Sequence, residues 1–560
     1  MHTAGVGLMI MMDEFTRAHG DLLTGSYDCT DRVVLNAYNP LCHSAGGFRE
    51  WWRRLNGGSD EDLDNAHLMR MAGRLSRRVR GFAKREAIPV IDCGKGERKH
   101  RIAEEYLLEH PEAQGLFLIL VARAVAPVWE VRRSSKRIFS IVKRLAFVNH
   151  YSFHIMDPEW GHVTIKMSGH PPFPAQVILN GHEYVACQAR SRGVEFRKEE
   201  NCFTHFSSAA ELARVADTLS EPRTVGRLSQ LCERWIYSSC LCFALDSAEQ
   251  QRTGFRYEYS VYQVEYSRNL LFQVGAQMQQ VFEAMVDRTR RRLDLREIRT
   301  IVGREQRPRT RPHRDRNPKP QVMVVTETPR YGLTVFKLHF GQLTLKVYTK
   351  GERVLRFEAI VHNTKALGCG RVVAKFPLVL AKLKAMLARF LDHLRWMDSP
   401  FVSDDTLDRL PLPCSIGKAQ VGGIDPNNPR MRGVLAAVLA LAASPNGFRV
   451  GDLAGKVREI TGQTISQYGS HRAAYDLKKL RAKGLVSRVG ASRRYEVPAA
   501  GIRTIAALSV LRDQVIKPLL ASAKTPTGRP NRKTALSIDD HYRTLRADME
   551  DLFADLHIAA

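Results

Sequence analysis

Histidine and acidic residues with the chemistry for metal binding or proton transfer gather where strands are expected. The segment His150-Tyr-Ser-Phe-His154 places two imidazoles on one face of a strand, with Asp157 close by. At about 3.3 Å per residue the imidazoles lie about 13 Å apart, which is too far for one metal ion unless the strand bends. Further acids and a histidine follow along the chain. The candidate catalytic residues are His150, His154, Asp157, His182, Glu183 and Glu358.

A second stretch, Asp92-Cys-Gly-Lys-Gly-Glu97-Arg-Lys99, resembles the D…E-x-K arrangement of metal-dependent nucleases. Those enzymes need the first acid and the E-x-K on neighbouring strands, whereas the short, glycine-rich spacing here allows only a tight turn. Gly94 and Gly96 would instead present backbone N–H groups, with Lys95 or Lys99, to a phosphate at the start of a helix. A plain strand-to-helix turn is the simpler interpretation.

The chain carries a large excess of positive charge. Its 560 residues include 85 Lys and Arg against 58 Asp and Glu, which gives a net charge of +27. Self-repulsion of that size destabilises a compact protein unless a polyanion meets it, so nucleic acid is the leading partner class and an anionic membrane surface the second. The 44% content of hydrophobic residues is typical of a globular chain and excludes wholesale disorder.

Nothing in the sequence indicates a membrane-spanning or secreted protein. No run approaches the roughly 18 apolar residues of a membrane span. Residues 5–12 lack the basic leader and the cleavage site of a signal peptide. The ten cysteines contain no C-x-x-C motif, which disfavours zinc ribbons and thioredoxin-like redox sites. We therefore expect a soluble cytoplasmic protein with reduced thiols.

Residues 430–498 carry the most specific pattern in the chain. Apolar side chains recur at helical spacing, and Gly462 and Gly484 are placed to end two of the helices. The pattern predicts helices over 433–443, 448–460 and 466–483, and the two strands of a basic hairpin over 485–489 and 493–497. Three helices followed by a hairpin is the order of elements in a winged helix-turn-helix.

The phrase Asp476-Leu-Lys-Lys-Leu-Arg-Ala-Lys-Gly-Leu-Val-Ser-Arg488 closely resembles the end of the recognition helix in winged-helix regulators of the MarR and ArsR families. The resemblance covers about 70 residues and implies contact with duplex DNA. Independently, helical periodicity places aromatic and basic residues opposite Leu477, and the hairpin adds arginines suited to phosphate contacts. The predicted DNA-binding residues are Tyr468, His471, Arg472, Tyr475, Lys479, Arg488, Arg493 and Arg494. A winged helix that contacts protein, with its charges solvated, is the alternative.

Residues 340–363 form the second informative stretch. Lys346-Val-Tyr-Thr-Lys350 followed by Val354-Leu-Arg-Phe-Glu358 resembles a paired-strand segment of phage and plasmid replication initiators, in which a Y-x-K…L-R-x-E pattern recurs. On a strand, Arg356 and Glu358 share one face. Rolling-circle initiators also have two histidines that flank one apolar residue, and this chain lacks that pattern. A half-buried strand with a surface Arg–Glu pair is the alternative interpretation.

Length and local patterns together predict several domains. Strand and helix alternate before residue 147, and the proline-rich basic stretch 307–320 has almost no apolar side chain. Residues 257–292 predict one long helix, in which Tyr259, Tyr262 and Tyr266 form a stripe typical of a core. The predicted fold class is α+β, with an α/β region at 1–147, a β-hairpin and helical region at 148–302, a basic linker at 303–320, an antiparallel β-meander with a helix at 321–398, a linker at 399–429, a winged helix at 430–522 and a tail with a short helix at 523–560.

Segments 96–106, 149–154 and 179–184 resemble a broad group of bacterial proteins of uncharacterised activity, and that resemblance implies no function. The sequence as a whole predicts a DNA-binding protein that serves replication, a mobile element or regulation. A metal-dependent nuclease, transposase or nicking initiator is the first alternative, and an RNA-binding or RNA-guided protein is the second. The expected partner is double-stranded DNA, with RNA as a further candidate and no membrane. No cofactor is expected, except a divalent metal ion for the nuclease.

Overall fold

The computed structural model describes most of the chain. The described residues are 13–94, 96–134, 137–199, 201–292, 322–327, 335–340, 342–398, 408–417, 419–444, 446–512, 544–545 and 547–548. The predicted basic linker at 303–320 lies outside them, as do all but four residues of the predicted tail at 523–560.

One large sheet organises the fold and confirms an α+β protein. Its eleven strands lie in the order β10 (Val322–Glu327), β11 (Val335–Phe340), β12 (Leu343–Lys350), β13 (Val354–Val361), β9 (Glu258–Phe272), β1 (Leu23–Tyr38), β6 (Ala175–Asn180), β5 (Gly161–Ser168), β4 (Arg137–Asp157), β3 (Gly115–Ser134) and β2 (Val90–Asp92). Every neighbouring pair is antiparallel except β2–β3. The alternation of strand and helix before residue 147 therefore does not produce a parallel α/β layer, because β3 and β4 form one long hairpin.

The sheet draws on three of the predicted domains. Residues 1–147, 148–302 and 321–398 all supply strands to it, and β4 itself crosses the predicted boundary at 147. The predicted meander is confirmed as β10 to β13, and it joins the rest of the sheet where β13 pairs with β9. The predicted hairpin around Pro158 is confirmed as β4 and β5.

Residues 257–292 were expected as one helix, and that expectation is wrong. They form the strand β9 and then the helix α10 (Gly275–Arg292). The tyrosines at 259, 262 and 266 have helical spacing, but this segment is a strand. Its backbone N–H and C=O groups form hydrogen bonds with β1 on one side and β13 on the other. At the end of β6, the Asn180 side chain caps the following helix by accepting from the His182 N–H.

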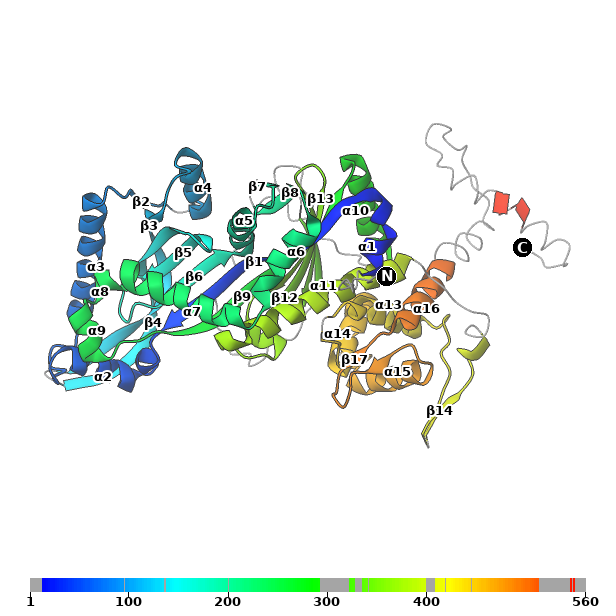
Figure 1. Cartoon of the computed structure of the whole chain (residues 1–560). Coiled ribbons are helices and arrows are strands. Elements are labelled where there is room, and N and C mark those ends of the chain that lie inside the picture. Colours follow the sequence, from blue (N-terminus) through cyan, green and yellow to red (C-terminus); the bar gives the residue numbers. More distant parts are fainter. Residues whose placement is uncertain are drawn as a thin grey trace, which may run out of the picture.

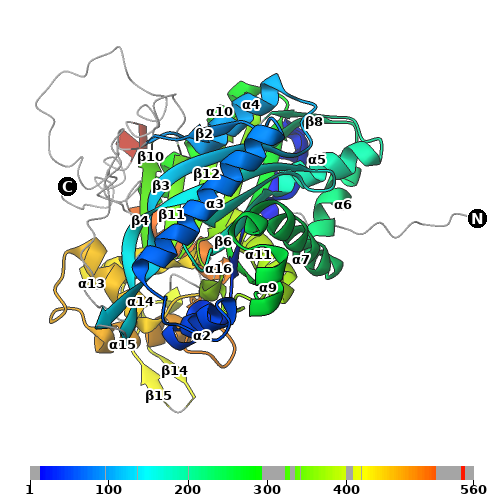
Figure 2. The same ribbon diagram turned by 90° about the vertical axis from the view of Figure 1, so that its left-hand side faces the viewer.

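Helices cover one face of the sheet and bury the main core. They are α2 (Ala45–Leu55), α3 (Asn65–Arg85), α7 (Arg223–Ile236), α8 (Cys242–Ala244), α9 (Ser247–Thr253) and α11 (Phe376–Asp398). Phe153 of β4 stacks on Phe243 of α8 with ring centroids 6.0 Å apart, and Phe357 of β13 meets Phe390 of α11 at 6.4 Å. Figure 2 shows α3 running along the sheet with α7 and α9 beside it.

The opposite face carries alternate polar residues of the strands, and we call it the polar face. Register places Ser152, Lys166 and Gln176 side by side on β4, β5 and β6, and Ser267 beside Glu358 on β9 and β13. The helix α4 (Lys99–Glu109) covers β3 on this face, because Ala103 packs with Leu118 and Leu120. The helix α5 (Gly181–Ser191) and the hairpin of β7 (Phe196–Glu199) and β8 (Cys202–Phe206) lie farther along; in Figure 1 all of them follow the upper side of the sheet.

The C-terminal part contains three helices and a short hairpin in the predicted order. They are α13 (Pro429–Ala442), α14 (Val450–Thr461), α15 (Ser470–Ala482), β16 (Ser487–Arg488) and β17 (Tyr495–Glu496), and we call them the C-terminal module. A further helix, α16 (Ala499–Val510), contacts both α11 and α13. A second small hairpin, β14 (Cys414–Ile416) and β15 (Ala419–Val421), precedes the module and contacts α15. In the part of the chain that the structure describes, no helix is both long and apolar enough to cross a membrane.

Candidate functional site

The helix α15 exposes part of the basic face that its sequence predicts. His471, Arg472 and Tyr475 are exposed, while Ala473, Leu477 and Leu480 are buried against α13 and α14. The structure adds Lys478, which is half-buried and has no hydrogen-bond or ion-pair partner among the described residues. The sequence prediction selected residues on the helix face opposite Leu477, and Lys478 was missed because it directly follows Leu477 in the chain. The exposed side of α15 is therefore basic and aromatic.

Tyr468 does not belong to this exposed face, and its prediction as a DNA-binding residue is corrected. The helix begins at Ser470, so Tyr468 lies in the preceding turn and does not follow the helical phase. Its side chain is fully buried, and its hydroxyl donates to the Asp476 carboxylate at 3.0 Å. Arg430 of α13 lies 3.3 Å from the same carboxylate group, so this trio joins α15 to α13.

Lys479 faces the small β14–β15 hairpin. Its ammonium donates to the Gly423 carbonyl at 3.0 Å and lies 5.1 Å from the centre of the Tyr475 ring. Lys483, one turn later, donates to the Leu412 carbonyl. The segment that precedes the module thus occupies one edge of α15.

The β16–β17 hairpin carries three arginines, of which one bonds within the hairpin and one bonds to the segment before α14. Arg488 donates to the Ser492 carbonyl across the turn, and Arg494 donates to the Gly447 carbonyl at 3.0 Å. Arg493 is exposed and has no partner among the described residues. Only Arg493 is therefore available to a ligand without breaking an existing contact.

Among the described residues, no acid forms an ion pair with the Lys and Arg side chains of this surface. Residues 470–497 contain eight Lys and Arg against two acids, Asp476 and Glu496, and Asp476 is buried. The Arg472, Lys479, Arg488 and Arg494 side chains donate to backbone carbonyls, which carry no net charge. Such a surface attracts a polyanion.

A second charged group is buried under the polar face, between β1, α5 and β13. Asp31 Oδ1 lies 2.9 Å from His182 Nδ1 and 3.6 Å from Arg356 Nη1, and all three side chains are at most 2% exposed. Burial opposes the ionisation of Asp31, yet the Arg356 and His182 groups outweigh it and hold the pKa of the Asp31 carboxyl below its usual range. Burial lowers the pKa of His182 to about 4, so a neutral imidazole stands beside a charged Asp31–Arg356 pair.

Glu358 and Arg356 share a strand face as predicted, but the expected surface Arg–Glu pair is wrong. Both are buried, and they bind different partners: Glu358 accepts from Lys346 at 2.8 Å, and Arg356 donates to Asn269 at 2.6 Å. Burial raises the pKa of Glu358 to about 7, with the Asp31 and Glu265 charges adding to the rise and Lys346 opposing it. The segment that resembles replication initiators thus supplies a buried, interconnected charge cluster.

His154 pairs with a histidine that the sequence argument did not name. Its Nδ1 lies 3.0 Å from Nε2 of His162 on the neighbouring strand β5. Burial lowers the pKa of His154 to about 3 and that of His162 to about 4. His150, four residues away, is 9% exposed, and its Nδ1 has no hydrogen-bond partner. The two predicted histidines therefore share a strand but not a site.

The carboxylates of Asp157 and Glu183 accept hydrogen bonds from neighbouring protein groups. Asp157 faces the helical side, where it accepts from the Trp160 N–H and from the Trp235 indole at 2.7 Å. Glu183 accepts from Lys198 at 2.5 Å. The six candidate catalytic residues thus do not form one site. Glu183 acts on His162, which contacts His154, while Asp31 links His182 to Glu358. Within the described ranges no three His, Cys, Asp or Glu residues are arranged to hold a metal ion.

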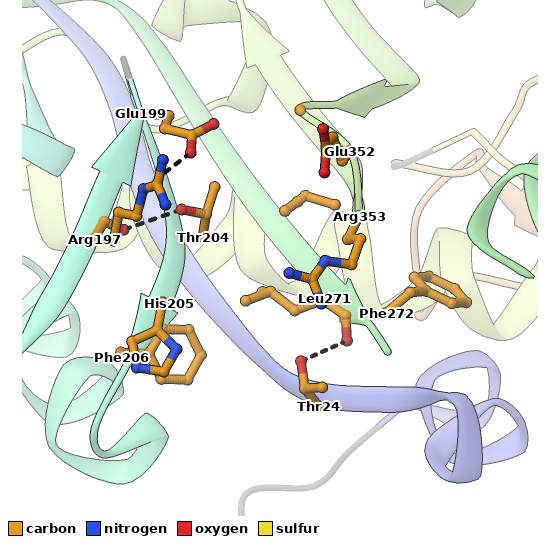
Figure 3. Close-up of a pocket in the computed structure, with 12 residues that line it drawn as sticks. Thr24, Arg197, Glu199, Thr204, His205, Phe206, Leu271, Phe272, Glu352 and Arg353 are labelled. Carbon is orange, nitrogen blue, oxygen red and sulfur yellow. Dashed lines mark hydrogen bonds and ion pairs between the residues drawn. The ribbon is translucent and has the colours of Figure 1, made fainter. Parts of the chain in front are cut away.

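A cavity of about 750 Å³ lies beside the β7–β8 hairpin. Arg197, Thr204 and Phe206 line one side of it, and Leu271 and Arg353 line the other (Figure 3). The Arg197 guanidinium lies 3.3 Å from Glu199, and both side chains are largely exposed. This mixed and internally paired lining favours no particular ligand charge.

Comparisons of the chain with models of protein families, with curated proteins and with solved structures found no match.

Proposed function

We propose that the protein binds duplex DNA through the C-terminal module, which forms a winged helix. The observation that carries the proposal is the uncompensated positive surface made by α15 and the β16–β17 hairpin. In a winged helix the third helix enters the major groove and the hairpin contacts the backbone beside it. His471 and Lys478 would then face the groove, and Arg493 a phosphate.

The buried trio of Tyr468, Asp476 and Arg430 supports this assignment of roles. It fixes α15 against α13 from the side opposite to the exposed residues. A recognition helix that reads DNA must be held rigidly by the rest of its domain. We infer a role in regulation, in replication or in a mobile element, all of which need such a DNA-binding module.

Replacing the free arginine of the hairpin tests the proposal directly. Arg493→Ala should weaken duplex binding on every sequence, because a phosphate contact carries no base information. The slope of log K against log salt should flatten by about 0.9 for the one lost contact. Fluorescence anisotropy of the full chain with a labelled duplex, over a series of salt concentrations, measures both quantities.

Arg252→Ala is the matched control for that experiment. Arg252 is also exposed and unpartnered among the described residues, but it lies on α9 at the other end of the protein (Figure 1). Equal affinities and slopes for the two variants would contradict the proposal and leave the module as a protein-contact surface. Recovery of RNA, and no DNA, from the purified protein would favour the RNA-binding alternative.

A further inference from the structure

Three cations belong to the elements of the polar face, away from the C-terminal module. Lys166 projects from β5 in register with Ser152 on β4 and Gln176 on β6. Arg32 projects from β1, where its partner across the pair is Asn180 of β6. Lys99 opens the helix α4, whose Ala103 packs on the β3 residues of this same face. We call these three residues the cation strip.

The cation strip lacks neutralising partners. Within the described part of the chain, none of the three side chains makes a hydrogen bond or an ion pair, and Lys99 and Lys166 are half-buried. The Arg32 charge acts on Glu265, but Lys346 acts on that carboxylate more strongly, and the carboxylate already accepts from Gln263 at 2.7 Å. Unpaired cations that are partly withdrawn from water are costly, so their retention needs an explanation.

The three charges act on one another. Burial lowers the pKa of Lys166, and the Lys99 and Arg32 charges lower it further. Lys99 and Lys166 likewise add to the lowering of the pKa of His150, whose buried Nδ1 has no partner. Mutual repulsion of this kind is relieved when an anion binds between the cations.

We propose that the cation strip binds the phosphodiester backbone of a nucleic acid, as a second contact separate from the C-terminal module. Polar side chains lie beside the strip on β5, β6 and β1. The Thr164 hydroxyl contacts His154 Nδ1 at 3.2 Å, and the Gln176 amide donates to Asn36 Oδ1 at 3.0 Å. The second Gln176 N–H and the Asn36 N–H groups can still donate to phosphate and sugar oxygens. Contacts to the backbone carry no base information, so binding through the cation strip should be independent of sequence.

The test compares two triple variants that remove the same charge. Lys99→Gln/Lys166→Gln/Arg32→Gln changes the cation strip, and Arg77→Gln/Lys84→Gln/Arg252→Gln changes exposed cations of α3 and α9 on the helical face. At about 0.7 per contact, loss of three phosphates should flatten the salt slope for a labelled single strand by about two, with no change in the control. The thermal midpoint of the strip variant should not fall, because its charges repel one another.

The outcomes separate this inference from the proposed function. Equal salt slopes for the two triple variants would refute nucleic-acid binding by the cation strip, whether or not Arg493→Ala weakens duplex binding. Weakened binding in the strip variant, together with normal duplex binding in Arg493→Ala, supports the strip and refutes the module. Displacement of the strand by inorganic pyrophosphate at equal phosphate concentration overturns the assignment to an extended backbone, because several linked contacts should outcompete a small anion.

Discussion

Arg356→Met should cost about 3–5 kcal/mol of unfolding free energy, because it removes one partner of a buried ion pair. The guanidinium donates to the Asn269 side chain and to the Asn201 carbonyl, and it faces Asp31. Without it, the Asp31 carboxylate stays buried with a neutral imidazole as its remaining neighbour. Urea unfolding of the variant at neutral pH measures the loss.

A second substitution shows whether the charge of Asp31 causes that loss. Asp31→Asn in the Arg356→Met background removes the stranded charge, so the double variant should be more stable than the sum of the two single losses predicts. Arg353→Met is the control, because Arg353 is exposed and directly precedes β13, the strand that carries Arg356. This substitution should change the free energy of unfolding by less than about 0.5 kcal/mol. Strictly additive losses would contradict the ion-pair explanation.

Local patterns were sufficient where an element's own residues decide its structure. The meander β10 to β13 and the helix α11 that follows it lie within the predicted region 321–398, because period-two and helical spacing are clear there. The strand β9 was missed, since its identity depends on pairing with β1 and β13, which lie far away in the chain. Sheet pairing between distant segments leaves no local signal.

The candidate sites also depend partly on local patterns and partly on contacts between distant segments. The shared face of Arg356 and Glu358 follows from strand alternation alone. Their burial and their partners do not, because Asp31 and His182 come from distant segments and the β7–β8 hairpin lies over β1. The cation strip likewise joins α4, β5 and β1, whose charges are separate in the sequence. Tyr468 was misplaced because the predicted helix began at residue 466, four residues before the observed start of α15 at Ser470.

Three buried histidines should make the protein unfold as the pH falls below about 6.5. His154, His182 and His393 are at most 4% exposed, and burial lowers their pKa values to about 3, 4 and 4. The folded state therefore binds fewer protons than the unfolded state, in which each histidine titrates near 6.5. The stability from each neutral imidazole is present above pH 6.5 and is lost as the pH falls toward 4, at about 2 kcal/mol per histidine by pH 5.

Glu358 opposes this trend with the opposite sign. Burial raises its folded pKa to about 7, so the folded state gains a proton that the unfolded state lacks between pH 7 and 4.5. That gain stabilises the fold by about 2 kcal/mol at pH 5, which offsets one histidine and leaves the other two. The net expectation from these four groups is a loss of about 4 kcal/mol between pH 7.5 and pH 5, a large fraction of the stability of a typical protein. His162, whose pKa burial also lowers to about 4, adds about 2 kcal/mol to that loss.

Replacing one buried histidine isolates its share of the acid sensitivity. His393 lies in α11, where its ring contacts Trp396 at 5.2 Å and its Nδ1 faces the Arg389 carbonyl. In His393→Gln, the slope of unfolding free energy against pH between 6 and 4.5 should fall by about 1.4 kcal/mol per pH unit, the value for one proton. His100→Gln is the control, because His100 is exposed on α4. Urea unfolding at several pH values gives both slopes, and an unchanged slope in His393→Gln would show that His393 takes up its proton equally in the folded and unfolded states.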